Sequence, residues 1–215
     1  MKSDIHPEYF KGLNFVLNEQ PDKAIEVFIR MTEVDSETVE THLALGNLFR
    51  RRGEVDRAIR VHQNLIARPT LNQDQRAHAL LELGMDYMRS GLLDRAEKLF
   101  LELVNLGLYL NEAYSHLLEI YQQEKDWENA ISVAKKNEII SGENFSPIIA
   151  QFYCEIAEND LNIGKINNAK EKIDDAISFN SKCVRASILE ARIFQLKGKI
   201  DYAIKCSLSI CFTLV

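Results

Sequence analysis

The sequence predicts an all-α protein, a right-handed helical solenoid of about six helix-turn-helix repeats, and two observations carry this prediction. The first is a short motif that recurs along the chain: an Asp, Glu or Asn, then one residue, then an Ala. The second is a position at a constant distance before each motif, where small residues predominate. The motif alanines are Ala24, Ala58, Ala96, Ala130, Ala169 and Ala203.

The spacing of these alanines sets the repeat length. Successive alanines lie 34, 38, 34, 39 and 34 residues apart, and 34 residues is the period of the tetratricopeptide repeat, a pair of antiparallel helices. The longer spacings add about one helical turn in the connections before the third and fifth repeats. We therefore expect a single array over residues 1–215, with the first helix of each repeat lining a concave surface. The expected repeats are about 5–38, 39–72, 77–110, 111–144, 150–183 and 184–215.

The second observation concerns the point where the two helices of a repeat cross. The crossing position, twelve residues before the motif alanine, holds Gly12, Gly46, Gly84, Leu118, Ala157 and Ala191. In the first three repeats a ring follows four residues after the alanine, at Phe28, His62 and Phe100. Glycine inside a helix costs about 1 kcal/mol relative to alanine. We therefore expect these glycines to allow close approach of a large side chain from the second helix.

Four of the remaining six glycines mark the turn within a repeat, and Gly107 and Gly142 fall between repeats. Gly53, Gly91, Gly164 and Gly198 fall between the two helices of their repeats, where a left-handed residue often ends a helix.

Composition and motifs argue against several classes of function. The net charge of −6 does not suit general nucleic-acid binding, which requires a basic surface. The four cysteines include no CxxC pair, so we expect packing thiols and no zinc or redox site. No signal peptide, membrane-spanning stretch, HExxH, P-loop, Rossmann or nucleophile-elbow pattern is present. We expect no enzyme activity, no catalytic residue and no metal or cofactor in this chain.

The repeat frame also predicts which side chains face a partner. Positions 2, 5, 9 and 12 of each first helix should point into the concave surface. The candidate protein-binding residues are Glu40, Leu43, Asn47, Arg50, Arg51, Leu81, Met85, Met88 and Glu119. Methionine packs adaptably at binding surfaces, so Leu81, Met85 and Met88 should form an apolar patch.

The basic run Arg50-Arg51-Arg52 has two interpretations. One is solvated charge at a helix C-terminus, where cations are favoured. The other is docking of an acidic partner segment. Asn47 matches the pattern of repeats that capture a chaperone's C-terminal carboxylate, but Leu43, Leu81 and Met85 do not, which argues against that activity.

Several runs of the sequence resemble one family. The run GLNFVLNEQPDKAIEVF, residues 12–28, and the long idiosyncratic run VETHLALGNLFRRRGEVDRAIRVHQNLI, residues 39–66, resemble the lipopolysaccharide assembly protein B family of Gram-negative bacteria. Residues 83–100 and 150–157 extend the resemblance over essentially the whole chain.

The resemblance implies a specific role. Members of that family are adaptors at the cytoplasmic face of the inner membrane, and they restrain lipopolysaccharide synthesis by promoting degradation of the deacetylase LpxC by the membrane protease FtsH. The implied partners are LpxC, FtsH and lipopolysaccharide-assembly proteins. Family members also carry an N-terminal anchor and a C-terminal rubredoxin-like metal domain with two CxxC pairs. This chain has neither, so we expect a soluble segment of the repeat array without the metal.

Two further expectations remain open. The chain could instead be the repeat-containing prefix of a larger enzyme such as a glycosyltransferase, although such enzymes need a nucleotide-sugar-binding domain that is absent here. The run YAIKCSLSICFTLV, residues 202–215, is an apolar final helix that could pair two chains into a homodimer.

Overall fold

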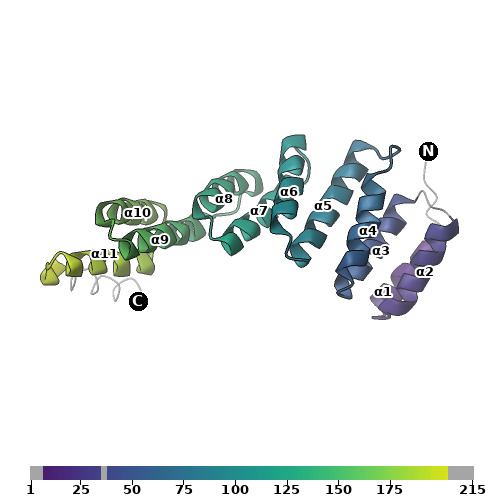
Figure 1. The fold of residues 1–215 in the computed structure, drawn as a ribbon, viewed down its shortest axis with the longest axis horizontal. Coiled ribbons are helices and arrows are strands. Elements are labelled where there is room, and N and C mark those ends of the chain that lie inside the picture. Colours follow the sequence, from purple (N-terminus) through teal and green to yellow (C-terminus); the bar gives the residue numbers. More distant parts are fainter. Residues whose placement is uncertain (1–6, 35–37, 203–215) are drawn as a thin grey trace. The chain divides into compact units, whose positions relative to one another are not determined.

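A computed structural model describes residues 7–34 and 38–202, and within these residues every regular element is an α-helix. The all-α prediction is confirmed. The helices are α1 (Pro7–Leu17), α2 (Pro21–Val34), α3 (Val39–Arg51), α4 (Val55–Ile66), α5 (Gln73–Arg89), α6 (Leu93–Leu106), α7 (Leu110–Glu124), α8 (Trp127–Ser141), α9 (Ser146–Asn162), α10 (Ile166–Phe179) and α11 (Val184–Leu196) (Figure 1).

The chain divides into two compact units, Met1–Ala113 and Tyr114–Val215, and each is described by itself. In the first unit α1 packs on α2, α3 on α4 and α5 on α6, as the repeat frame predicts (Figure 1). The prediction of one continuous array over residues 1–215 stays a prediction.

Close packing at the helix crossings confirms the expected use of glycine in the first unit. A Cβ atom added to Gly84 would lie 2.6 Å from the ring of Phe100, and one added to Gly12 would lie equally close to the ring of Phe28. Both rings are fully buried. Real Cβ contacts are not this short, so these positions require glycine for the rings to seat where they do.

The turn between the two helices of a repeat has the same backbone conformation along the chain. Gly53, for example, has φ +82°, in the left-handed region that glycine adopts without steric cost. The equivalent positions of the first and fourth repeats hold Glu19 and Lys125, with φ of 55° and 59°. A residue with a Cβ is strained there, by about 1–2 kcal/mol.

The extra residues before the third repeat are helical. The repeat spacing counted them with the connection, although a helix over about 73–90 was also expected. α5 begins at Gln73 and contains 17 residues, against 13 in α3. Asn72 caps this longer helix: its side chain accepts a hydrogen bond from the Gln75 backbone N–H at 2.8 Å, and the Gln75 side chain bonds back to the Asn72 N–H. This reciprocal capping box satisfies two otherwise unpaired donors and moves the helix start one turn earlier.

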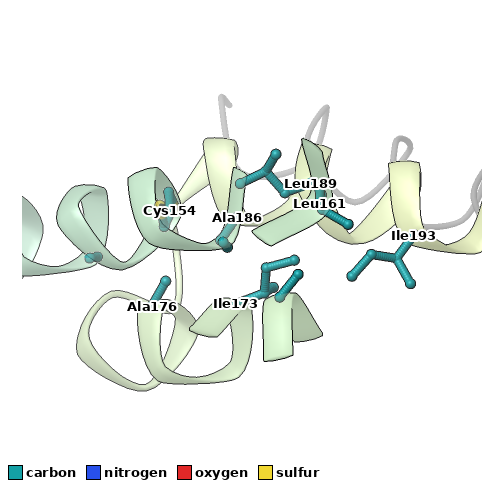
Figure 2. Close-up of a cluster of buried hydrophobic side chains, with 11 residues drawn as sticks. Cys154, Leu161, Ile173, Ala176, Ala186, Leu189 and Ile193 are labelled. Carbon is teal, nitrogen blue, oxygen red and sulfur yellow. Dashed lines mark hydrogen bonds between the residues drawn. The ribbon is translucent and has the colours of Figure 1, made fainter. Parts of the chain in front are cut away.

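The core of the second unit contains a cluster of small and aliphatic side chains from α9, α10 and α11 (Figure 2). Ala157 and Ile173, at the positions that hold glycine and a ring in the first unit, are both fully buried. Cys154 and Cys183 are buried free thiols with sulfur atoms 3.8 Å apart. Burial raises the pKa of Cys154 to about 12, as expected for a packing thiol.

Part of the predicted sixth repeat lies outside the described residues. The description ends at Tyr202, so Cys206, Cys211 and the apolar run 202–215, with the homodimer expected from it, fall almost wholly beyond it.

Candidate binding groove

A hollow of about 310 Å³ opens on the first helices of repeats one to three, within the first unit. Its floor is apolar and its rim is polar. The lining residues are Tyr9 from α1, Val39, Glu40, Leu43, Ala44 and Asn47 from α3, and Asp74, Gln75 and His78 from α5. We call this hollow the groove. It has the size of a small ligand pocket and can receive one or two side chains of a peptide.

The charge of the groove is set by Glu40 and Asp74, both exposed. Burial and then the nearby Glu40 carboxylate raise the pKa of Tyr9. The pKa of His78 is also raised, first by a hydrogen bond to Glu82, against the opposing effect of burial, and then by the charges of Glu82, Asp74 and Glu40. The Glu40 carboxylate contributes to both shifts, although burial is the main cause at Tyr9 and the hydrogen bond to Glu82 is the main cause at His78.

An aromatic stack borders the groove. The ring of His78 lies on that of Tyr109, with centroids 5.7 Å apart and planes 26° from parallel. Tyr109 has φ 51°, which is unusual for a bulky residue. Burial, then Asp74 and Glu112, raises the pKa of the Tyr109 hydroxyl. The stack and the Asp74 interaction hold the side chain of His78 beside the opening.

Beneath the groove lies a buried ionic network. The Arg50 guanidinium donates to the Glu82 carboxylate at 2.7 Å, to the Asp86 carboxylate at 2.8 Å and to the Asn47 side-chain oxygen at 2.9 Å. His62 Nδ1 donates to the other Asp86 oxygen at 2.6 Å, and both of these side chains are fully buried. The network therefore joins α3, α4 and α5, and we call it the Arg50 network.

The Arg50 network controls the ionisation of Glu82. Burial alone would raise the pKa of this carboxyl, but hydrogen bonds from His78 and Arg50 outweigh burial and hold the pKa at about 2. Glu82 is therefore an anion at neutral pH although its side chain is only 9% exposed. An ion that is buried in this way is stable only while its partners remain in place.

The structure brings three of the predicted binding residues into the groove: Glu40, Leu43 and Asn47. Leu43 contributes to the floor but is only 7% exposed, so it is not a freely presented side chain as the sequence suggested. Asn47 also interacts with Glu82 besides accepting from Arg50, so its amide is occupied inside the protein.

The other predicted residues of the first unit do not line the groove. Leu81 is buried, at 6% exposed, which corrects the apolar patch expected there; Met85 and Met88 are half-buried. Arg50 is held in its network, which corrects the expectation that it faces a partner. Arg51 is exposed.

The rest of the basic run has internal partners as well. Arg52 pairs with Asp22 and, at 3.3 Å, with Glu54. Neither interpretation of the arginine run describes Arg50 and Arg52, because both pair with carboxylates of the same chain. Glu119 is exposed on α7 in the second unit, 3.7 Å from His116. Whether any of these residues binds a partner stays a prediction.

Sequence reasoning missed Tyr9 and Asp74. Tyr9 occupies position 5 of the first repeat, so the rule applied to the later repeats would have found it. Asp74 precedes the expected start of repeat three and reaches the groove because α5 begins a turn early. No repeat consensus contains that signal.

None of the described helices has the length and apolar character needed to cross a membrane. Over residues 7–34 and 38–202, no group of three His, Cys, Asp or Glu side chains is arranged to hold a metal ion.

Family models match two parts of the chain. A tetratricopeptide repeat model matches residues 41–76, and a PPR repeat model matches residues 86–108. The chain is a tetratricopeptide-repeat protein. It is 40% identical over 198 residues to lipopolysaccharide assembly protein B of Escherichia coli K12, and 38% identical over 207 residues to that of Haemophilus influenzae. These matches cover 92% of this chain and confirm the resemblance to that family.

The chain spans about half the length of these curated relatives, 51% and 52% respectively. Solved structures agree on the fold. The Cut9–Hcn1 hetero-tetramer of APC/C matches with a TM-score of 0.54 at 18% identity, over 96% of this chain and 41% of that one. YrrB, described as a tetratricopeptide-repeat protein with an unusual peptide-binding site, matches with a TM-score of 0.52 at 14% identity, over 88% and 93%.

Proposed function

We propose that this tetratricopeptide-repeat chain is the partner-binding part of an adaptor, a scaffold without catalytic activity or cofactor. The observation that carries the proposal is the groove, a hollow built on α1, α3 and α5 with Glu40, Leu43 and Asn47 at the expected partner-facing positions. Its apolar floor and polar rim suit an extended peptide segment, because apolar contact supplies affinity and polar groups fix orientation.

The finer proposal follows from similarity to lipopolysaccharide assembly protein B. We propose that the chain acts at the cytoplasmic face of the bacterial inner membrane, and that its partners are LpxC, FtsH and lipopolysaccharide-assembly proteins. In this role the adaptor brings LpxC to FtsH for degradation. The net charge of −6 fits protein partners better than nucleic acid.

Capture of purified partners tests the proposal. Immobilised chain should retain purified LpxC and detergent-solubilised FtsH. Ala44 is half-buried in the groove lining, so Ala44→Leu should fill part of the hollow and weaken capture roughly tenfold, about 1.4 kcal/mol. Ala67→Leu, at an exposed position at the end of α4, is the matched control and should capture normally.

If the immobilised chain retains neither LpxC nor FtsH, the adaptor role for these partners is refuted. Normal capture by a folded Ala44→Leu variant would refute the groove as the binding site. A combined Arg51→Ala, Met85→Ala and Met88→Ala variant then tests the remaining predicted surface of the first unit.

A further inference from the structure

The groove has a definite charge preference, and this inference rests on the proposed function of the groove as the partner site. The carboxylates of Glu40 and Asp74 line its rim, and their charges add to the larger effect of the Glu82 hydrogen bond in raising the pKa of His78. Glu112 adds to the same potential at Tyr109. Charges on one side of a hollow with an apolar floor focus the field into it.

The cation beneath the groove does not offset this potential. The guanidinium of Arg50 is shared between Glu82 and Asp86, at 2.7 Å and 2.8 Å. The guanidinium is therefore already paired with two carboxylates inside the protein. Asn47, which would have to contact a bound carboxylate, already accepts from Arg50 and interacts with Glu82. The groove is therefore unsuited to an acidic peptide end.

Aromatic side chains complete the site. The ring of Tyr9 lines the groove and is steadied by Phe28, with centroids 5.6 Å apart. A cation over an aromatic face gains about 0.5–1 kcal/mol at an exposed site. The apolar floor at Val39 and Leu43 suits the methylene stem of a long basic side chain, which buries its carbons while its head stays at a polar rim.

We propose that the groove binds a lysine or arginine side chain of an extended partner segment. The stem lies on the floor formed by Val39 and Leu43, the charged head lies between Glu40 and Asp74, and Tyr9 flanks it. The partner of this site is a basic peptide segment, in contrast to the acidic segment that the run Arg50-Arg51-Arg52 suggested.

Fixed-position peptide libraries test this specificity. The probes are fluorescein-labelled ten-residue pools with one fixed central residue and degenerate flanks, and binding to the purified chain is measured by fluorescence anisotropy. Arg and Lys pools should bind roughly five- to tenfold more tightly than Leu, Gln or Glu pools, as expected for two partly exposed carboxylates and one ring. Raising the salt concentration should reduce the preference.

Matched variants separate local charge from net charge. Glu40→Gln/Asp74→Asn should abolish the preference for basic pools, and Glu40→Lys/Asp74→Lys should reverse it toward Glu pools. Glu26→Gln/Glu102→Gln changes the net charge by as much as Glu40→Gln/Asp74→Asn, at exposed positions on α2 and α6, and should leave the preference intact. A preference for Leu or Glu pools, equal binding of all pools, or loss of preference in the control would overturn the proposal.

The two proposals fail in different ways. If the chain captures the proposed partners through the groove but shows no basic preference, the charge assignment is wrong and the adaptor function stands. If basic pools bind selectively in the groove but those partners are not captured, the charge assignment stands and the adaptor function is wrong.

Discussion

The two units differ in the residues that pack where the two helices of a repeat cross. In the first unit each helix crossing pairs a glycine with a ring, as at Gly84 and Phe100, where an added Cβ would lie 2.6 Å from the ring. In the second unit the equivalent crossing holds Ala157 and Ile173, both fully buried. A glycine costs about 1 kcal/mol of helix propensity, but it admits a larger buried ring. In both units the first helix supplies the small residue and the second helix the large one, and a glycine in place of alanine goes with a ring in place of an aliphatic side chain.

The units also differ in where they place charge. The first unit buries the Arg50 network between α3, α4 and α5. In the second unit the ion pairs between helices are partly exposed: Arg185 reaches Glu158 at 2.6 Å with its side chain 33% exposed, and Lys170 reaches Glu190 at 2.7 Å. Partly exposed pairs contribute little stability. The candidate binding groove lies over the buried network, which holds α3 and α5 in fixed relation.

Removal of one buried partner should have the largest effect. Asp86→Ala leaves Arg50 and His62 without their shared acceptor, and breaking a buried ion pair costs about 3–5 kcal/mol. Arg185→Ala in the second unit should cost about 1 kcal/mol or less. Urea unfolding followed by far-UV circular dichroism compares the two. Equal losses would show that the difference in burial has no energetic consequence.

Acid should selectively weaken the first unit. The folded pKa of Glu82 is about 2, against an ordinary value of 4.5. Because the folded pKa is depressed, its stabilisation is complete above the unfolded pKa and is lost as pH falls from 4.5 toward 2. A shift of this size corresponds to about 3 kcal/mol.

Unfolding free energies at pH 6 and pH 3 should differ by about 2 kcal/mol from this group, the part of the loss that falls above pH 3. Glu82→Gln should have a smaller pH dependence over the same range. An unchanged slope in that variant would assign the acid sensitivity to other carboxyls.

A larger residue at the crossing glycine should show whether the glycine–ring pair of the first unit tolerates the alanine that the second unit carries. Gly84→Ala drives a methyl group into the ring of Phe100, and overpacking costs about 1–3 kcal/mol, partly offset by better helix propensity. The double variant Gly84→Ala/Phe100→Ile imitates the crossing of the second unit and should recover part of the loss. Stability that rises in the single variant would contradict the close approach.

The smallest expected effect is a gain. Lys125 has φ 59° at the turn where other repeats carry glycine, so Lys125→Gly should relieve strain and stabilise the chain by about 1 kcal/mol. Trp127, the single tryptophan, begins the helix after this turn and stacks on Phe152, so its fluorescence follows the change in urea. Lys136→Gly, at an exposed position within α8, is the control and should destabilise by a similar amount.

The sequence by itself determined the repeat, the helix pairs and the positions of the crossing glycines, because these depend on local spacing and on the absence of a Cβ. It also placed Glu40, Leu43 and Asn47 at one surface, since a helix presents fixed positions on one face.

Only the tertiary structure decided what those side chains contact. Arg50 pairs with residues 32 and 36 positions later, and Asp74 reaches the groove because α5 starts a turn early. Tyr9 joins them from the preceding repeat. Helical periodicity predicts the face of the helix on which a side chain lies. It does not predict which side chains of the adjacent helix come within contact distance. The same arginine can therefore face a partner or neutralise two buried carboxylates, and in this protein it neutralises the carboxylates.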